Sequence, residues 1–334
     1  MKAAKILPVL LLLLLLAACG RSGTGEQSTA APAEGAAAFP LPDPEESRAM
    51  ARVIAANRVL CRGNALFCYD FDEDWLPVLA RYTREDGTLR DFTVLARGCV
   101  PEYLSWLDGW LYYLDRSSGA LERVPEQGGS RQLLREGPCS CLSVWEGQLC
   151  FCDGQGRFLA LDPADGSETL LLEGPCSFAF PLTGAILFRE EDRGRILLRQ
   201  EDGSESVLSP EGASPPLLLE DRLWYSVGTR LFGQSMTGGE PLVYALPEHD
   251  GDPELLPAAQ GLLLRGIRDE NGPSQWEGPP EGPFVRQPRG YRICDWLGLG
   301  LQVDTVYEPD GRIRCYLLLD EGGNRLSFLA GRTS

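Results

Sequence analysis

The stretch EGQLCFCD, residues 146–153, recurs along the chain with the same order of polar turn residues and apolar residues, although most of the amino acids differ. Related stretches read DGWLYYLD at 108–115, TGAILFRE at 183–190 and EDRLWYSV at 220–227, so that the spacing is 37 or 38 residues. In the first three, a polar residue followed by Gly predicts a tight turn between two antiparallel strands. The apolar residues after the turn form the second of those strands.

Two further turn signals follow in each repeat. The first is a glycine that opens a third strand: Gly119, Gly156 and Gly194. The second is a polar triplet before a fourth strand: Gly-Gly-Ser at 128–130, and Asp-Gly-Ser at 165–167 and 202–204. Four short strands in each period predict one antiparallel sheet, and four-stranded sheets repeated at this period are typical of the blades of a β-propeller.

Weaker copies begin near residues 63, 260 and 310, which brings the count to seven units. Because residues 268–292 are irregular, six or eight units remain as alternatives. The sequence therefore predicts an all-β fold, a β-propeller of four-stranded antiparallel blades. A β-sandwich or barrel also has regular turns, but neither predicts a three-part signature at a fixed period.

The unit G-x-L-Y-Y-x-D, followed by G-x-L-x-R and D-G-S, resembles the repeats of secreted bacterial propellers of unknown function. Those repeats are themselves similar to the propeller of low-density-lipoprotein receptors. Receptor propellers carry Tyr-Trp-Thr-Asp in the second strand, where this chain has LYYLD, LCFCD, ILFRE and LWYSV. The resemblance, which spans roughly residues 60–330, implies blades and transfers no ligand.

The N-terminus has the pattern of a bacterial lipoprotein signal. Lys2 and Lys5 precede an apolar run that is too short to span a bilayer, and the run ends in Leu-Ala-Ala-Cys at 16–19. This pattern predicts cleavage before Cys19 and lipid modification of Cys19. We therefore expect a protein anchored by lipid on the extracytoplasmic face of the cell membrane.

Composition divides the rest of the chain. Residues 1–18 form the predicted signal peptide, and residues 19–43, rich in Gly, Ser, Ala, Pro and Glu, form a flexible tether. Asp43-Pro44-Glu45-Glu46 has the features of a helix start, so a short helix is expected within 44–57. Residues 58–334 then form the propeller.

The charge balance argues against nucleic acid as a partner. The chain has 48 acidic and 31 basic residues and a formal net charge of −17. Such a surface repels polyanions. Glycine-rich phosphate loops are missing as well, so no nucleotide cofactor is expected.

Candidates for catalysis and metal binding are few. His249 is the single histidine, which makes a histidine-rich metal site unavailable. Asp70, Asp72 and Asp74 alternate as in the first half of a calcium loop, yet the Gly and Glu of the helix-loop-helix version are missing, so these residues are weak metal candidates. A pair of carboxylates would suffice for glycoside cleavage, but no spacing singles out a pair.

Ten cysteines besides Cys19 permit disulfides in an exported chain. Counting outward from the turn at 146–147 gives three opposed pairs: Trp145 with Gln148, Ser143 with Cys150, and Cys141 with Cys152. Opposed strand residues have Cβ atoms about 4.5–5.5 Å apart, close to the separation of about 3.5–4.5 Å in a disulfide. A Cys141–Cys152 bridge is therefore a prediction, with two free buried thiols as the alternative.

Together these features predict a lipid-anchored propeller that binds or scaffolds a protein, peptide or glycan ligand. The alternative is a propeller hydrolase or lyase that acts on polysaccharide through Asp and Glu. A pair of acids roughly 5–10 Å apart in a central pocket would favour the enzyme.

Overall fold

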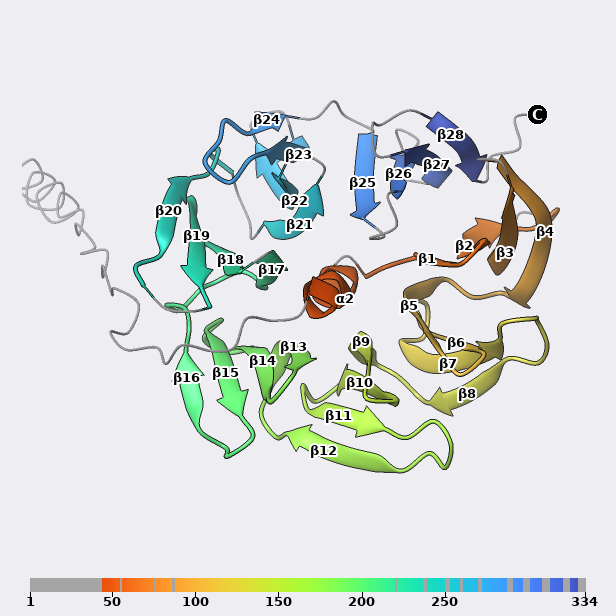
Figure 1. The fold of residues 1–334 in the computed structure, drawn as a ribbon, viewed down its shortest axis with the longest axis horizontal. Coiled ribbons are helices and arrows are strands. Elements are labelled where there is room, and N and C mark those ends of the chain that lie inside the picture. Colours follow the sequence, from red (N-terminus) through yellow and green to blue (C-terminus); the bar gives the residue numbers. More distant parts are fainter. Residues whose placement is uncertain are drawn as a thin grey trace, which may run out of the picture. The chain divides into compact units, whose positions relative to one another are not determined.

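The computed structural model describes residues 44–54, 56–74, 76–85, 88–219, 221–236, 239–249, 253–258, 261–269, 272–286, 291–296, 301–307, 313–320 and 325–329. All of them lie within the compact unit Pro32–Ser334. Their strands form seven four-stranded antiparallel sheets, each in chain order, arranged as a ring (Figure 1). The predicted propeller is confirmed, and the described strands make seven blades.

Blades 1 to 3 come first along the chain. Blade 1 consists of β1 (Val59–Arg62), β2 (Ala65–Phe71), β3 (Pro77–Glu85) and β4 (Thr88–Arg97). Blade 2 consists of β5 (Pro101–Leu107), β6 (Trp110–Asp115), β7 (Ala120–Pro125) and β8 (Gln132–Arg135). Blade 3 consists of β9 (Cys139–Trp145), β10 (Gln148–Asp153), β11 (Phe158–Leu161) and β12 (Glu168–Leu172). In each blade the first strand lies nearest the ring centre (Figure 1).

Blades 4 to 7 follow the same order. Blade 4 consists of β13 (Cys176–Leu182), β14 (Ala185–Glu190), β15 (Ile196–Gln200) and β16 (Glu205–Val207). Blade 5 consists of β17 (Leu217–Leu219), β18 (Arg222–Val227), β19 (Arg230–Ser235) and β20 (Leu242–Ala245). Blade 6 consists of β21 (Glu254–Ala258), β22 (Gly261–Asp269), β23 (Gly272–Gly278) and β24 (Val285–Arg286). Blade 7 consists of β25 (Tyr291–Trp296), β26 (Leu301–Tyr307), β27 (Ile313–Asp320) and β28 (Arg325–Leu329).

The repeated eight-residue stretch contains the turn from the first to the second strand of a blade. Asp108-Gly109 and Glu146-Gly147 both have positive φ at each residue, 48° and 82° in the first turn and 48° and 78° in the second. Two consecutive positive φ values define the hairpin turn whose twist matches that of the flanking strands. The predicted pairings of Trp145 with Gln148 and of Ser143 with Cys150 are confirmed.

The glycine before each third strand joins one blade to the next. Gly119 and Gly156 have φ values of 71° and 73°, and their carbonyls accept hydrogen bonds of 2.9 Å from the backbone N–H groups of Cys139 and Cys176. A Cβ on Gly156 would lie 2.8 Å from Pro175 Cα. Only glycine fits this backbone conformation and this close approach, so the repeat sequence specifies the joint between blades as well as the strands.

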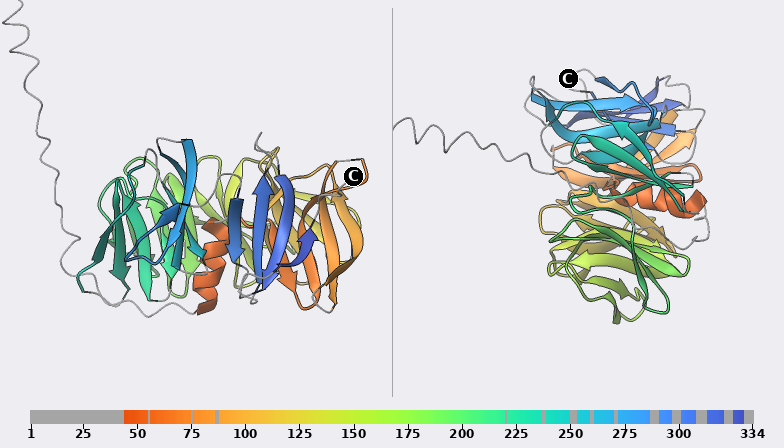
Figure 2. Two further views of the ribbon diagram at one scale, coloured as in Figure 1. Left: turned by 90° about the horizontal axis from the view of Figure 1, so that it is seen from above. Right: turned by 90° about the vertical axis from the view of Figure 1, so that its left-hand side faces the viewer.

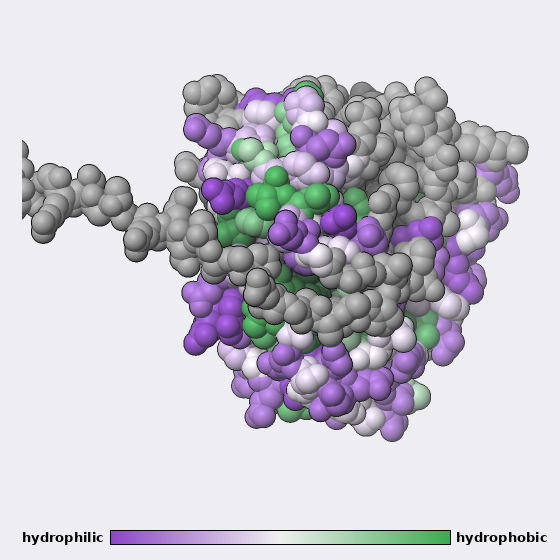
Figure 3. Space-filling model, turned by 60° about the vertical axis from the view of Figure 1, so that its left-hand side comes forward, coloured by the Kyte–Doolittle hydropathy of each residue, from purple (hydrophilic) through white to green (hydrophobic). Residues whose placement is uncertain are grey.

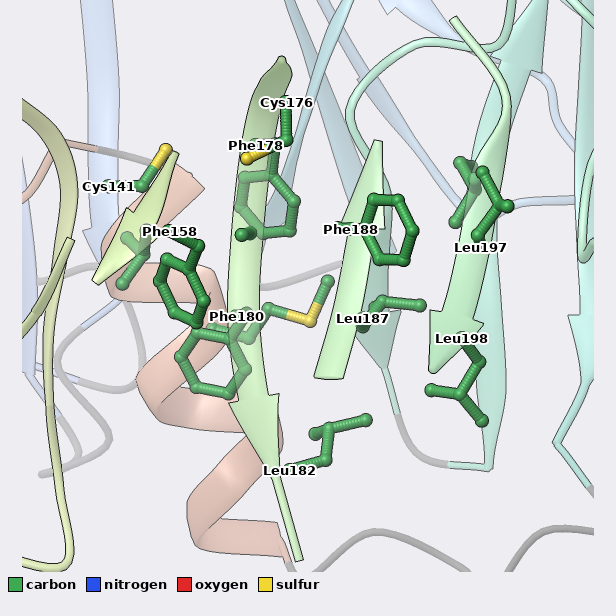
Figure 4. Close-up of a cluster of buried hydrophobic side chains, with 14 of the residues drawn as sticks. Cys141, Phe158, Cys176, Phe178, Phe180, Leu182, Leu187, Phe188, Leu197 and Leu198 are labelled. Atoms are coloured by element: carbon green, nitrogen blue, oxygen red, sulfur yellow. The ribbon is translucent and has the colours of Figure 1, made fainter. Parts of the chain in front are cut away.

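Apolar side chains fill the space between adjacent blades. The largest cluster combines residues of blades 3, 4 and 5, and Figure 4 shows Phe158 of β11 and Phe180 of β13 side by side near the ring centre. Both are fully buried or nearly so, at 0% and 1% exposure. The hydrophobic effect therefore acts mainly across blade interfaces, which ties each blade to its neighbours.

The outer strands present apolar side chains to solvent. Figure 3 shows hydrophobic surface set among hydrophilic residues on the side that carries blades 4 to 6. On fourth strands the exposed large apolar residues include Leu133, Leu170, Val207, Leu242, Val243 and Val285. They are spread over five blades.

A single described helix lies at the centre of the ring. Helix α2 (Pro44–Ile54) falls within the predicted range and runs roughly along the ring axis (Figures 1 and 2). It contacts β9, β17, β21 and β25, the first strands of blades 3, 5, 6 and 7. Met50 is fully buried there, and Val53 is 5% exposed. The helix is the central plug of the propeller.

One carboxylate fixes the first turn of this helix. Glu46, 7% exposed, accepts hydrogen bonds of 2.7 Å from both the backbone N–H and the hydroxyl of Thr183, in the first turn of blade 4. Asp43, the first residue of the predicted helix start, lies outside the described residues. The register of α2 along the channel is thus set by a polar contact in addition to apolar packing.

Candidate functional site

A partly open cavity of about 300 Å³ lies beside the plug, between α2 and the first strands of blades 1, 2 and 3. Its wall consists of Ala49, Arg52, Val53, Asn57, residues 60–62, residues 103–106 and residues 142–144. This volume is at the lower end of the range for small-molecule sites. The ring centre therefore contains a space of ligand size that the helix does not fill.

β-Bulges shape the strands that border the cavity. Tyr103 in β5 and Cys141 in β9 have φ values of 56° and 55°, and the strand register shifts around both. The two residues are 38 positions apart, and so occupy the same place in consecutive repeats. A bulge bends its strand and redirects the side chains that follow, here residues 104–106 and 142–144.

Arginines supply all the charge in the described wall. Arg62 lies with its Cζ 3.5 Å from the ring centroid of Trp106, and its guanidinium donates to Glu126 at 2.8 Å. Glu126 also accepts a 2.8 Å hydrogen bond from Trp106 Nε1. Arg52 is half-buried, and burial lowers its pKa, an effect that the charge of Glu45 offsets only in part.

Two buried polar atoms of the wall have no hydrogen-bond partner in the protein. They are Asn57 Nδ2 and Ser143 Oγ, in residues that are 1% and 4% exposed. The other polar groups of Asn57 are engaged, since Oδ1 accepts from Val59 N at 3.1 Å and the carbonyl accepts from Leu104 N at 2.9 Å. Unmet buried polar groups cost about 1–3 kcal/mol each and are rare in native proteins.

The carboxylates of the repeats have structural roles at turns. Asp115 accepts hydrogen bonds from Val100 N and Ser117 Oγ at 3.0 and 2.8 Å. Burial opposes the charge of Asp115, but these hydrogen bonds outweigh it and lower the pKa. Asp153 likewise accepts from Arg157, at 3.0 Å from N and 2.6 Å from Nη2. None of the described residues that line the cavity is Asp or Glu.

The structure does not bring the three candidate calcium ligands together. Asp70 accepts from Phe71 N and from the hydroxyl of Tyr82. Asp72 accepts from the backbone N–H groups of Asp74 and Leu76 at 3.0 Å, and pairs with Arg97. Among the described residues no group of three His, Cys, Asp or Glu side chains is arranged to hold a metal ion.

The predicted register at Cys141 is wrong. Cys152 pairs with Ser140, because the bulge at Cys141 inserts one extra residue into β9. Cys141 and Cys152 are both free thiols in the structure, and Cys152 Sγ lies 3.6 Å from Cys176 Sγ in the next blade. Hydrogen bonds with Cys141 and Cys176 favour the protonated form of Cys152 and raise its pKa. Cys152, which is buried and has a raised pKa, is therefore protonated and unreactive as a nucleophile, while the Cys141–Cys152 bridge remains a prediction.

Any disulfide formed here in an oxidising preparation is expected to include Cys152, because its sulfur contacts both neighbouring thiols. The substitution Cys152→Ser should leave Cys141 and Cys176 fully alkylated in non-reduced peptide maps. The wild-type map then identifies which neighbour is the partner. A Cys141–Cys176 bridge, in either protein, would contradict this expectation.

The predicted lipidation residue, Cys19, lies outside the described residues. Within the part of the chain that the structure describes, no helix has the length and apolar character needed to cross a bilayer.

Sequence reasoning identified none of the cavity residues as a site. The signal that was available is the repeat itself: residues 103–106 and 142–144 hold equivalent positions on first strands, 38 residues apart. That signal indicates a site only when the first strand of each blade is known to line the ring centre.

Comparison with known proteins shows the fold alone. No family model and no curated protein sequence matches the chain. A puromycin-hydrolysing peptidase of Mycobacterium tuberculosis is 15% identical, with a TM-score of 0.53 over 88% of this chain and 57% of the peptidase. BamB of Moraxella catarrhalis is 13% identical, with a TM-score of 0.48 over 81% of this chain and 86% of BamB. The chain is a β-propeller.

Proposed function

We propose that this protein is a lipid-anchored, extracytoplasmic β-propeller that binds or scaffolds a protein, peptide or glycan ligand. The observation that carries the proposal is the cavity at the ring centre, whose described wall combines arginine, aromatic and apolar side chains without a carboxylate. A concave, largely apolar site with a few polar groups is the usual form of a binding site.

The cavity does not favour the polysaccharide hydrolase or lyase. Such an enzyme would need two carboxyl groups facing one space, at a separation of about 5–10 Å. Arg52 and Arg62 occupy the charged positions of the wall instead. Asp115 and Asp153, acids of the repeat itself, are held by turn hydrogen bonds.

The anchor is tested by fractionating cells that express the full chain or its Cys19→Ser variant. We expect the wild type in the membrane fraction and the variant either released or left with its signal uncleaved, because lipid modification requires the thiol. A variant that stays on the membrane with a normally processed N-terminus would refute the anchor.

Binding is tested by affinity capture of the lipidated protein from detergent-solubilised native envelope, with the same tag and tether on an unrelated domain as control. We expect a protein or glycan enriched over the control. The purified protein is also incubated with envelope polysaccharides, and release of new reducing or unsaturated ends would establish the enzymatic alternative.

A further inference from the structure

We propose that the central cavity binds the carboxylate of a small organic acid or of a peptide C-terminus, with an apolar group beside it, between Arg52 and Arg62. This inference rests on the proposed function as a binding module and specifies the ligand chemistry of its site.

The charges of the wall select an anion. Arg52 and Arg62 both border one space of about 300 Å³, and the described wall contains no acidic residue. This is unusual in a chain with a net charge of −17, whose surface repels anions elsewhere. A guanidinium carries five N–H donors in a planar fork, so the single ion pair from Arg62 to Glu126 does not use up its capacity. Two such groups match the two oxygens of a carboxylate.

The remaining wall determines what accompanies the carboxylate. Leu104, Leu142, Val144 and Val53 contribute apolar surface, and Trp106 contributes an aromatic ring that Arg62 already covers. A ligand that is charged throughout would leave this surface unmatched. An acid with one apolar side chain, such as a free amino-acid derivative or the last residue of a peptide, fits both parts.

Two further groups of the wall call for polar contacts. Asn57 Nδ2 is a donor, and Ser143 Oγ is a donor and an acceptor; both lack a partner in the protein. Asn57 lies between α2 and β1, and Ser143 lies in β9; both residues border the cavity, but the two unpartnered atoms are buried beneath its surface. Burial also lowers the pKa of Arg52, and a bound carboxylate would relieve that cost.

The test is isothermal titration of the full chain with N-acetyl-L-phenylalanine and with its neutral amide, N-acetyl-L-phenylalaninamide. We expect the acid to bind at least about tenfold more tightly than the amide, because a charged hydrogen bond contributes about 1.5–3 kcal/mol. Equal affinity for the two probes, or no binding of the acid up to about 10 mM, would overturn the proposal.

Variants locate the site. Arg52→Met is expected to weaken binding of the acid about tenfold and to leave binding of the amide unchanged. Arg62→Lys keeps the charge but loses the planar fork, so it should weaken binding of the acid by a smaller factor than Arg52→Met does. Arg193→Met is the matched control, since Arg193 is exposed in blade 4 and does not line the cavity. Unchanged affinity of both folded cavity variants would refute the assignment.

A third probe, acetyl-Gly-Gly-Gly-Phe with a free C-terminus, distinguishes the two sources of the carboxylate. Binding of this peptide and of the short acid assigns a peptide C-terminus, whereas binding of the short acid alone assigns a free organic acid; both results support the carboxylate site. If no acid binds while affinity capture still yields a partner, only this inference fails and the binding function stands.

Discussion

Deletion of residues 139–175, one complete repeat, is expected to abolish the cooperative unfolding transition. These residues form blade 3, whose Phe151 and Phe158 are fully buried, and α2 contacts its first strand. A ring that loses a blade exposes two blade faces or must close at a different angle. The junction itself introduces no new local sequence, because the chain reads Gly-Pro-Cys-Ser at both 137–140 and 174–177.

Circular dichroism and intrinsic fluorescence, followed on the same thermal ramp, measure this effect. The matched control is Leu170→Ala in the same blade, where the side chain is 47% exposed and its loss should be almost neutral. A deletion variant that melts in one sharp transition near the wild-type midpoint would argue against a closed ring.

The second large effect is expected at the plug. Met50→Asp should lower the free energy of unfolding by at least about 4 kcal/mol, since it places a charge at a fully buried position surrounded by apolar side chains. Met50→Leu, which nearly conserves volume, should cost less than about 1.5 kcal/mol. Denaturant titration gives both values.

A Met50→Asp variant as stable as Met50→Leu would show that α2 does not pack in the channel in solution. The exposed Arg48 on the same helix provides a further comparison, because Arg48→Ala should change stability by less than about 0.5 kcal/mol.

The repeat made the blades predictable because their signals are local. Asp108-Gly109 and Glu146-Gly147 specify hairpins through backbone conformations that few residues adopt, and the pairing next to those turns follows by counting. Counting failed at Cys141, where a non-glycine residue takes a positive φ and inserts a bulge. The residue type does not predict that conformation.

The site was not predictable in the same way because it is built from distant segments. The acidic start of α2 predicted a helix, yet no local pattern states that Met50 lies on the axis of a ring. Arg52, Trp106 and Ser143 come from a helix and two blades, and they share a cavity only after those elements have packed together.

The central position of α2 has a consequence for the order of events in folding. Its residues are synthesised before every blade, but they contact strands as distant along the chain as β21 and β25. Contacts of such sequence separation form late, since loop closure must precede them. The first described element to be synthesised is therefore among the last to dock, and its docking marks the completion of the ring.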